Sequence, residues 1–372
     1  MKKIVFITNN FSIGGTERFL LDLIGKIQKD YSISLVTILG AGPLLEEFKK
    51  LNIDIYCVGS RNEYKRSFMQ RLSALLLLPV SAFRLLFLLI RIKPDIVVTS
   101  LWQSDFIGMK VALFAGVKDR ILIQHDVQKL SFIANLSKKF ISLPLPKKII
   151  ANSNATKKFL IDNWQVNGGK IDVIYNGIDT EKFIKIEKIK PKNISIGIIG
   201  RLEPVKGHIF LLKALKILKD LHNLEPDVYI AGTGRLESSL KLYVADNNLK
   251  SVHFLGREDS PEFLKKIDIL VVPSLHEGFC LAALEGLFVG KIVVASDIDA
   301  IKEFITDNQN GILFAKGDTK ALAENLYRIS TDKRFRDDLC DKTKIWAEKN
   351  KEKFDLSSVA KNYKKLFDSL VG

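Results

Sequence analysis

The segment that decides the fold is residues 268–296, DILVVPSLHEGFCLAALEGLFVGKIVVAS. Its two ends, DILVVPS and KIVVAS, are short apolar runs rich in β-branched residues, and each predicts a buried strand. The residues between them predict a loop followed by a helix. A strand, a helix and a second strand in this order are typical of a parallel sheet with helices packed on it, so the segment predicts an α/β domain.

The same alternation extends in both directions along the chain. Further predicted strands of the second half are ISIGII, DVYIAG and VHFLG. Those of the first half are KIVFIT, ISLVTIL, IDIYCV, DIVVTS, RILIQH, KIIANS and IDVIYNG. A length of 372 residues with 47% hydrophobic content is enough for two cores. We therefore expect two Rossmann-like domains that face each other across a cleft, where such folds bind nucleotides.

Domain boundaries are predicted from changes in composition along the chain. The first domain covers residues 1–177 and the second covers residues 194–355. Residues 178–193 include the charged, non-periodic run EKFIKIEKIKPKN and are expected to form the linker. Residues 356–372 carry apolar side chains at helical spacing, so we expect a last helix that packs back on the body.

Composition bounds the class of protein and its partners. Three scattered cysteines and five isolated histidines provide neither a disulfide framework nor metal-ligand spacing, so no structural metal is expected. The formal charge of +15 favours anionic partners such as phosphorylated small molecules, acidic lipids or nucleic acid. The apolar run after Met1 is shorter than that of a signal peptide and predicts a first strand, which favours a cytoplasmic location.

Residues 65–93 form a basic and strongly apolar segment. No acidic residue lies between Glu63 and Asp95, and the run LSALLLLPVSAFRLLFLLI is interrupted by Pro79 and Arg84. The cations of the segment are Lys65, Arg66, Arg71, Arg84, Arg91 and Lys93. The interruptions argue against a membrane-spanning helix. Two compatible interpretations stay open: a pair of helices buried in an α/β domain, and attachment to an anionic membrane surface.

Two loops that lead from a predicted strand into a helix carry groups suited to binding phosphate. The loop NNFSIGGTER contains Gly14 and Gly15, which permit an anion to approach the main chain closely, although glycines also serve ordinary turns. The loop GRLEPVKGH contains Arg201 and Lys206, two cations that suit a diphosphate and can stabilise it as a leaving group. The alternative for the second loop is a solvated basic surface.

A third loop, within residues 268–296, is followed by a helix and carries two glutamates. Glu277 lies in the loop, and Glu285 lies about two helical turns later. Ionised carboxylates accept hydrogen bonds from sugar and ribose hydroxyls. Main-chain N–H groups at the start of the predicted helix can hold a phosphate between the two carboxylates. These N–H groups belong to Phe279, Cys280 and Leu281. The alternative is an ordinary amphipathic helix with a solvated glutamate.

Four motifs, in their order and spacing, resemble those of the retaining family-4 glycosyltransferases of the GT-B fold. They are NGID at 176–179, GRLEPVKG at 200–207, AGTG at 231–234 and EGFCLAALEG at 277–286. The resemblance extends from the GGTE loop to the strand at 291–296. It implies a GT-B arrangement of two Rossmann-like domains, in which the first binds the acceptor and the second binds the nucleotide-sugar.

The resemblance also implies roles for residues of the second domain. Arg201 and Lys206 would bind the diphosphate of the sugar donor and neutralise it as it leaves. Glu277 would contact the transferred sugar, and Glu285 would bind the ribose hydroxyls. Cys280 stands where the family usually has glycine, so the identity of the sugar donor stays open.

Residues of the first domain are also implied in the site. Gly15 would approach the donor phosphate from that domain. His125 would lie near the reacting sugar, although a lone histidine at the end of a strand is more often structural. No metal is expected, because the triplet Asp297-Ile298-Asp299 follows a strand in a region unlike that of metal-dependent transferases.

The predicted activity is transfer of a hexosyl group with retention of anomeric configuration. The nucleotide-diphosphate-sugar is a co-substrate, and no cofactor is expected. The acceptor is expected to be a lipid-linked or cell-surface glycan, as in capsule or lipopolysaccharide synthesis. Attachment through residues 65–93 to the inner face of the membrane fits such an acceptor, and no nucleic-acid partner is expected.

Rival functions are distinguished by their chemistry. A nucleotide-sugar epimerase of the same fold would isomerise its substrate without any acceptor. A non-enzymatic nucleic-acid-binding protein would use the positive charge, but the sequence has no recognised binding motif. A dinucleotide dehydrogenase is excluded because no G-x-G-x-x-G follows a first strand with an acidic residue about 20 positions further on.

Overall fold

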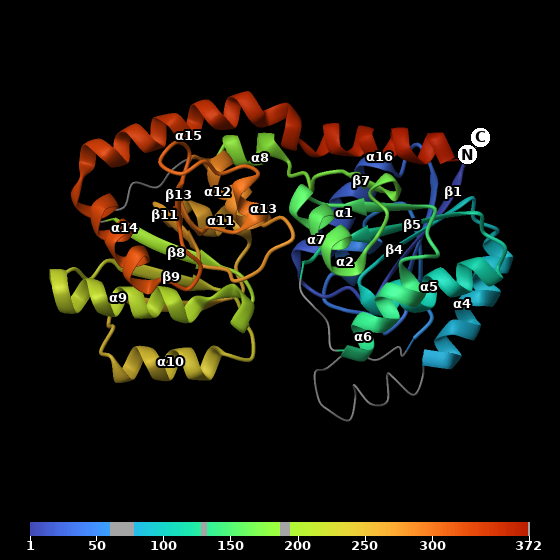
Figure 1. The fold of residues 1–372 in the computed structure, drawn as a ribbon, viewed down its shortest axis with the longest axis horizontal. Coiled ribbons are helices and arrows are strands. Elements are labelled where there is room, and N and C mark those ends of the chain that lie inside the picture. The colour runs from blue at the N-terminus through green and yellow to red at the C-terminus, as the bar shows by residue number, and fades with distance from the viewer. Residues whose placement is uncertain (60–77, 128–131, 187–193, 371–372) are drawn as a thin grey trace. The chain divides into compact units, whose positions relative to one another are not determined.

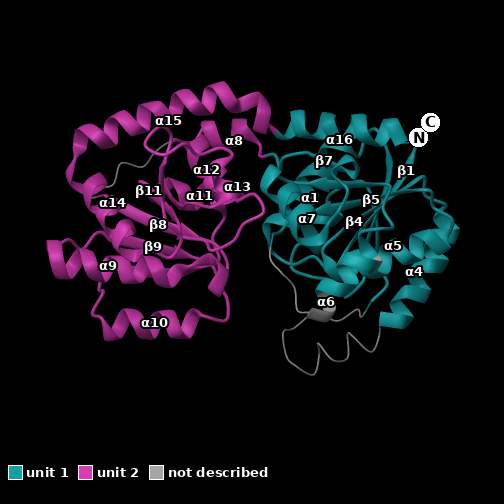
Figure 2. Ribbon diagram, in the orientation of Figure 1, with its two compact units in different colours: residues 1–177, 356–372 teal, residues 178–355 magenta. Residues whose placement is uncertain are grey.

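A computed structural model describes residues 1–59, 78–127, 132–186 and 194–370. The chain forms two compact units, each built on its own parallel sheet (Figure 1). Unit 1 comprises residues 1–177 and 356–372, and unit 2 comprises residues 178–355 (Figure 2). The predicted fold class, two Rossmann-like α/β domains, is confirmed.

The sheet of unit 1 has seven parallel strands in the order β3-β2-β1-β4-β5-β6-β7. The strands are β1 (Lys3–Thr8), β2 (Ser32–Thr37), β3 (Asp54–Cys57), β4 (Ile96–Ser100), β5 (Asp119–Gln124), β6 (Lys148–Ala151) and β7 (Ile171–Val173). The order of the strands reverses between β1 and β4, which is where doubly wound sheets bind ligands at their carboxyl ends.

The helices of unit 1 are α1 (Gly15–Ile27), α2 (Leu45–Lys49), α4 (Leu78–Ile92), α5 (Trp102–Phe114), α6 (Phe132–Ser137), the π-helix η1 (Lys138–Ser142), α7 (Asn154–Trp164), the 3₁₀ helix η2 (Gly168–Lys170) and α16 (Leu356–Leu370). Helices cover both faces of the sheet. Val5 and Ile7 of β1 pack in one core cluster with residues of α4 and α5. Phe6 points to the other face, where its ring lies 6.2 Å from that of Phe367 in α16.

Unit 2 repeats this architecture with six parallel strands in the order β10-β9-β8-β11-β12-β13. The strands are β8 (Ser195–Ile199), β9 (Asp227–Ala231), β10 (Val252–Gly256), β11 (Ile269–Val272), β12 (Ile292–Ser296) and β13 (Ile312–Phe314). The helices are α8 (Thr180–Ile184), the 3₁₀ helix η3 (Pro204–Lys206), α9 (His208–His222), α10 (Glu237–Asp246), α11 (Ser260–Lys265), α12 (Leu281–Val289), α13 (Asp299–Lys302), α14 (Thr319–Thr331) and α15 (Lys333–Phe354). The order reverses between β8 and β11.

The chain passes between the units at two places. The stretch predicted as a linker starts with ordered structure, because residues 178–186 contain α8, whose Phe183 is buried. Residues 187–193 lie outside the described residues. The two crossings, after residue 177 and after residue 355, are bonded to each other, because the main-chain N–H of Ile178 donates to the carbonyl of Phe354 over 3.0 Å. The Thr180 hydroxyl also donates to the Asp355 carboxylate over 2.8 Å, so the two ends of unit 2 are hydrogen-bonded to each other.

Candidate active site

The loop after β8 places Arg201 and Lys206 at the carboxyl end of a central strand. Arg201 is exposed, and Lys206 ends the short helix η3, directly before α9. Gly207 has φ +69°, and a Cβ there would lie 1.9 Å from the carbonyl oxygen of Pro273. Only glycine fits between these two loops, which brings Lys206 beside the loop that carries Glu277.

Lys206 and Glu277 form an ion pair across the two loops. Nζ of Lys206 lies 2.6 Å from Oε1 of Glu277, and the hydroxyl of Ser274 donates to the same oxygen over 2.7 Å. Burial alone would lower the pKa of the Lys206 ammonium, but the Glu277 carboxylate raises it above its ordinary value. Lys206 is therefore positively charged at neutral pH, and its side chain is 26% exposed.

The loop after Glu277 leads into α12 through a strained residue. Cys280 has φ +74° and ψ 74°, a region that side chains other than glycine rarely adopt. Burial, with the nearby Glu277 carboxylate, raises the pKa of the Cys280 thiol to about 12, so the thiol stays protonated. The Phe279 side chain is buried, with its ring 5.5 Å from that of Phe304, so Phe279 can offer a ligand only its main chain.

Glu285 lies on α12 and faces the start of α11. The hydroxyl of Ser260, the first residue of α11, donates to Oε2 of Glu285. This contact restricts the rotation of the carboxylate. The remaining lone pairs of an ionised carboxylate can accept hydrogen bonds from vicinal hydroxyls.

The glycine loop of unit 1 contains an acidic group that the sequence analysis did not single out. Gly15 is the first residue of α1. Glu17, in the first turn, is buried and accepts a hydrogen bond from the Ser12 hydroxyl over 2.8 Å. A Cβ at Gly14 would lie 2.6 Å from Oε2 of Glu17, so a larger residue there would displace the end of this side chain.

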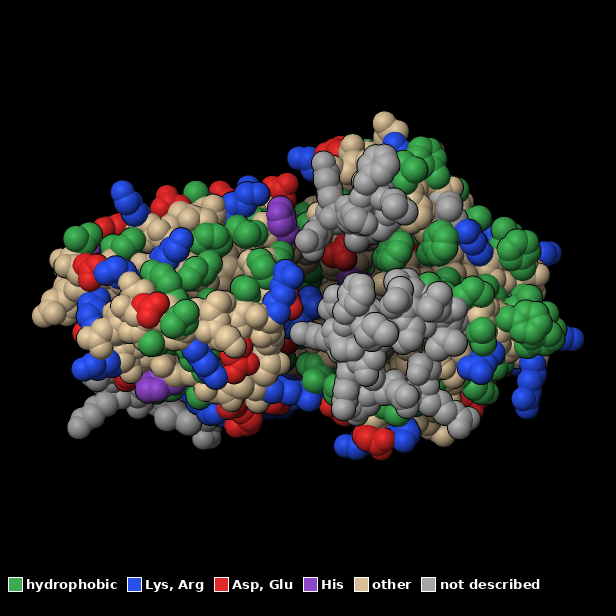
Figure 3. Space-filling view, turned by 90° about the horizontal axis from the view of Figure 1, so that it is seen from below, with side chains coloured by type: hydrophobic (Ala, Val, Ile, Leu, Met, Phe, Trp, Pro, Cys, Tyr) green, Lys and Arg blue, Asp and Glu red, His purple; other side chains and the backbone are tan. Residues whose placement is uncertain are grey.

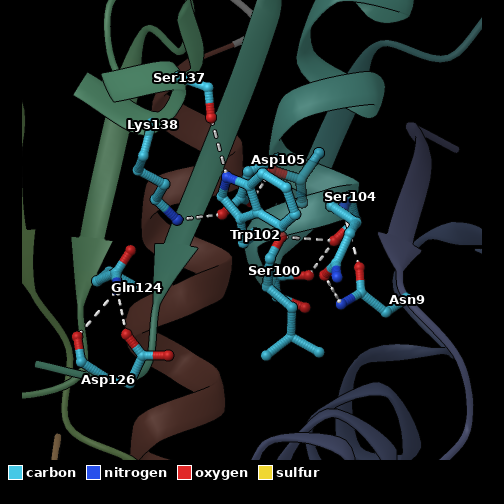
Figure 4. A network of polar contacts seen from close by, with 12 residues as sticks. Asn9, Ser100, Trp102, Ser104, Asp105, Gln124, Asp126, Ser137 and Lys138 are labelled. Carbon is cyan, nitrogen blue, oxygen red and sulfur yellow. Dashed lines mark hydrogen bonds and ion pairs between the residues drawn. The ribbon is translucent and has the colours of Figure 1, made fainter. Parts of the chain in front are cut away.

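His125 directly follows β5 and lines the same small hollow as Lys138, whose buried ion pair with Asp105 is drawn in Figure 4. The Lys138 ammonium contacts the carboxylate of Asp105, and their side chains are 3% and 0% exposed. The hydroxyl of Thr99 donates to the other carboxylate oxygen over 2.6 Å. Burial, together with the Lys138 charge, lowers the pKa of His125 to about 3. His125 is therefore neutral at physiological pH.

No group of three or more His, Cys, Asp or Glu side chains suited to a metal ion occurs in the part of the chain that the structure describes. The triplet predicted to be unrelated to metal binding lies at the start of α13. Asp297 and Asp299 are 2.9 Å and 3.5 Å from Nζ of Lys302. A lysine therefore neutralises both carboxylates.

The described part of the basic apolar segment is α4, and residues 65–77 lie outside the described residues. One face of α4 packs on the sheet, and the opposite face exposes apolar side chains at a spacing of three and four residues. These side chains are Val80, Phe83, Phe87 and Ile90, between 43% and 62% exposed. At the end of the neighbouring helix α5, Leu113 and Phe114 are also exposed. We call these six residues the apolar surface of unit 1.

Exposed cations lie on and next to the helices that carry the apolar surface. Arg84, Arg91 and Lys93 are exposed on and after α4, and Lys118 is exposed after α5. Figure 3 shows hydrophobic and basic side chains gathered together at the outer part of unit 1, where α4 lies. Within the described ranges, no helix combines the length and apolarity needed to cross a bilayer.

The structure brings some of the predicted residues together in unit 2 and places the others separately in unit 1. Lys206, Glu277 and the start of α12 form one group in unit 2, while Gly15 and His125 belong to unit 1. The sequence analysis missed Ser260, Asp105 and Lys138, whose partners are distant in the chain, and Ser274, which is three residues from Glu277. The only sequence signal for Ser260 is the sequence DSPE, which is typical of a helix start.

Both halves of the chain match known protein families. A profile of Glycosyl transferases group 1 matches residues 179–346, and a profile of Glycosyltransferase Family 4 matches residues 13–182. An Escherichia coli protein named UDP-Gal:α-D-GlcNAc-diphosphoundecaprenol α-1,3-galactosyltransferase is 32% identical over 265 residues, which is 65% of this chain and 67% of that protein.

Two further similarities agree with these matches. A Campylobacter jejuni N-acetylgalactosaminyltransferase named for an undecaprenol-diphosphate-linked acceptor is 26% identical over 273 residues, 70% of this chain and 72% of that protein. The structure of Anabaena HepE in complex with UDP and glucose superposes with a TM-score of 0.83 at 20% identity and covers 99% of this chain and 100% of HepE. The likeness to HepE shows the shared fold.

Proposed function

Since this chain belongs to the group 1 glycosyltransferases and has their GT-B fold, we propose that it moves a hexosyl group from a UDP-sugar to a polyprenyl-diphosphate-linked saccharide, with retention of anomeric configuration. The observation that carries the proposal is the Lys206–Glu277 pair at the carboxyl end of β8. A charged lysine at this place is suited to a diphosphate, and the adjoining carboxylate is suited to sugar hydroxyls.

The diphosphate of the sugar donor would bind between Arg201, Lys206 and the main-chain N–H groups at the start of α12. As the bond between sugar and phosphate breaks, negative charge grows on the leaving diphosphate. A preorganised ammonium and guanidinium stabilise that charge without reorganisation. Glu285, with one oxygen held by Ser260, would accept hydrogen bonds from the ribose hydroxyls.

Metal-independent transfer is part of the proposal. In other enzymes a divalent ion stabilises the negative charge of a departing phosphate group. Here the two cations, Arg201 and Lys206, would stabilise it. Lys302 supports this assignment, because it pairs with both Asp297 and Asp299. Transfer rates are expected to stay unchanged in excess EDTA, and a loss of activity restored by Mg²⁺ or Mn²⁺ would refute metal independence.

The acceptor and its location are proposed from the relatives and from the apolar surface of unit 1. Both relatives described above are named for diphosphoundecaprenol-linked acceptors. Phe83 and Phe87 are exposed on α4 with their rings 4.6 Å apart, and cations flank them. Aromatic side chains beside lysine and arginine suit the interface of an anionic membrane. We therefore place the enzyme at the inner membrane face, in cell-surface glycan synthesis such as that of capsule or lipopolysaccharide.

Transfer is tested by a thermal-shift titration of the full chain with UDP-, GDP-, ADP- and dTDP-sugars. A selective shift with a UDP-sugar, lost in Glu285→Ala, is the expected result. The product of incubation with a polyprenyl-diphosphate-linked N-acetylglucosamine is then examined by proton NMR for the α-anomeric signal. A β-linked product would refute retention. The absence of a thermal shift with all four nucleotide-sugars would refute the proposed donor site.

Membrane attachment is tested by flotation with vesicles of phosphatidylglycerol and phosphatidylethanolamine. We expect Phe83→Ser/Phe87→Ser to bind at least tenfold more weakly, because each phenylalanine loses about 1.5–3 kcal/mol of burial in lipid. The matched control is Leu221→Ser/Leu242→Ser, two exposed leucines of unit 2. Equal flotation of the α4 variant and the wild-type protein would refute this attachment.

The two rival functions have less support. An epimerase would need no acceptor, and the family is one of transferases. The expectation that nucleic acid is not a partner is part of the proposal. Gel-shift measurements with the full chain are expected to show only weak, salt-sensitive binding.

A further inference from the structure

We propose that Ser274 is a positioning residue, whose hydroxyl orients the carboxylate of Glu277 for the sugar part of the donor. The hydroxyl lies in the loop after β11 and donates to Oε1 of Glu277 over 2.7 Å. The inference rests on the function proposed above, in which Glu277 binds sugar hydroxyls. It assigns to a buried, uncharged group the preference for a UDP-sugar over UDP.

The main chain on both sides of Ser274 is fixed by the loop that follows β8. The main-chain N–H of Leu275 donates to the carbonyl of Val205 over 2.8 Å. On the other side, the carbonyl oxygen of Pro273 packs so closely against Gly207 that a Cβ there would lie 1.9 Å away. Ser274 itself is 1% exposed. Its hydroxyl is therefore held in place before any ligand binds.

Two donors share one oxygen of the Glu277 carboxylate. Oε1 accepts from Nζ of Lys206 over 2.6 Å and from the Ser274 hydroxyl. Among the residues that the structure describes, none donates a hydrogen bond to Oε2. An ionised carboxylate accepts at both oxygens, so Oε2 remains for the hydroxyl groups of a sugar.

A bound diphosphate changes the partners of Glu277. Its negative charge competes with the carboxylate for the Lys206 ammonium, which is 26% exposed. The Ser274 hydroxyl is buried, so the diphosphate does not reach it and its bond to Glu277 stays in place. The Glu277 side chain is only 12% exposed, and a carboxylate at such a place is costly without a donor. Ser274 therefore keeps the carboxylate oriented in the donor complex.

A hydrogen bond between residues three apart can also serve only the shape of a loop. The two roles differ in the ligand that they affect. A change in loop shape would move the main-chain N–H groups at the start of α12, so it would weaken binding of UDP and of a UDP-sugar alike. A positioning role acts through Glu277 and concerns only the sugar.

The role of Ser274 is tested by calorimetric titration of the full chain. The ligands are UDP, UDP-galactose, UDP-glucose and UDP-N-acetylglucosamine, and the UDP-sugar that binds most tightly is compared with UDP. In Ser274→Ala, we expect Kd for the UDP-sugar to rise about fivefold to tenfold and Kd for UDP to stay within about twofold. An equal change in both values, or a change in neither, would overturn the inference.

A double-mutant cycle tests whether Ser274 acts through Glu277. In the Glu277→Ala background, Ser274→Ala is expected to change Kd for the UDP-sugar by less than about twofold, because the hydroxyl no longer has a carboxylate to orient. The same rise in both backgrounds would show that Ser274 acts independently of Glu277. That result would also overturn the inference.

Ser195→Ala is the matched control. Ser195 is 2% exposed, and its hydroxyl donates to the Asp268 carboxylate over 3.0 Å at the amino end of β8. The control removes a buried bond of the same kind from the same unit, and both Kd values are expected to stay unchanged. Ser274→Cys, which keeps the size of the side chain but is a weaker donor, is the second variant and should show the same selective rise.

Failure of the proposed function gives a different result. A wild-type protein that binds neither UDP nor any of the three UDP-sugars would refute the donor site, and the role of Ser274 with it. A wild-type protein that binds them, with no selective rise in either Ser274 variant, would refute only the role of Ser274.

Discussion

The two units share one architecture, but the ion-paired lysine is partly exposed in unit 2 and buried in unit 1. In unit 2, Lys206 is 26% exposed and pairs with Glu277 in a loop at the end of the sheet. In unit 1, Lys138 is 3% exposed and pairs with a fully buried aspartate, Asp105. The lysine of a partly exposed ion pair can contact a ligand phosphate in place of the carboxylate. In a buried pair, the two charges neutralise each other inside the protein. The same residue type can therefore bind an anion in unit 2, whereas in unit 1 it neutralises a buried carboxylate.

The largest effect is expected from removing the lysine of unit 2. Lys206→Met is expected to lower kcat by about 10²–10³, because the leaving diphosphate loses one preorganised cation. Initial rates at saturating substrate measure this effect. Lys216→Met, whose ammonium pairs with Asp220 on the exposed face of α9, is the control and should keep its rate. A residual rate above about a tenth of wild type in Lys206→Met would contradict the role of this lysine.

The acid sensitivity of the folded state is expected to depend on two histidines of lowered pKa, one in each unit. Burial and the nearby Lys206 lower the pKa of His208 to about 4, and burial and Lys138 lower the pKa of His125 to about 3. Because the folded values lie below the unfolded value of about 6.5, the unfolded chain binds more protons in that window. The contribution of these histidines to stability is therefore fully present above the unfolded pKa, and it is lost as the pH falls toward the folded pKa.

The free energy of unfolding is expected to fall by about 1–2 kcal/mol per histidine between pH 7 and pH 5. Urea unfolding of His208→Gln at both pH values should show a smaller loss than that of the wild-type protein. The exposed His276→Gln serves as control and should follow the wild-type dependence. Identical losses in His208→Gln and wild type would show that this histidine is not the source of the acid sensitivity.

A smaller effect is expected at the partner of Glu285. Ser260→Ala removes the hydroxyl that donates to Oε2, so the carboxylate rotates more freely before the sugar donor binds. We expect KM for the UDP-sugar to rise about threefold to tenfold with kcat nearly unchanged. Ser239→Ala, whose hydroxyl donates to a main-chain carbonyl in unit 2, is the control. A fall in kcat with constant KM would instead assign Ser260 to the transition state.

The smallest effect is expected at the strained residue of the donor loop. Cys280→Gly and Cys280→Ala both remove the thiol, and only glycine adopts φ +74° without strain. The glycine variant should be more stable than the alanine variant by about 1 kcal/mol, measured by urea unfolding. Greater stability of Cys280→Ala would show that the backbone here is not strained.

Features carried by neighbouring residues were predictable from the sequence. The strand-helix alternation and the apolar runs of both sheets are local patterns, and the structure contains the strands at those places. The loop that holds Arg201 and Lys206 was also recognised, since its glycines and cations are adjacent in the chain. The outward face of α4 follows from its helical periodicity, although its location at a surface required the structure.

Features that depend on tertiary contacts were not predictable. Lys138 and Asp105 are 33 residues apart, and Ser260 and Glu285 are 25 residues apart. No local pattern marks such pairs, because folding brings them together. Leu101, with φ +78°, is a non-glycine residue in a conformation that favours glycine, and its sequence carries no sign of this.

The position of α16 has a consequence for synthesis on the ribosome. Unit 1 is discontinuous in the chain, because α16 returns to it after all of unit 2 has been made. Phe19 lies 6.0 Å from Tyr363, and the hydroxyl of Tyr31 donates to the Asp368 carboxylate over 2.9 Å. The nascent first unit therefore completes its core only after α16 has been made, while unit 2 has all of its residues earlier. A chain that stops at residue 355 would leave the earlier-made unit as the incomplete one.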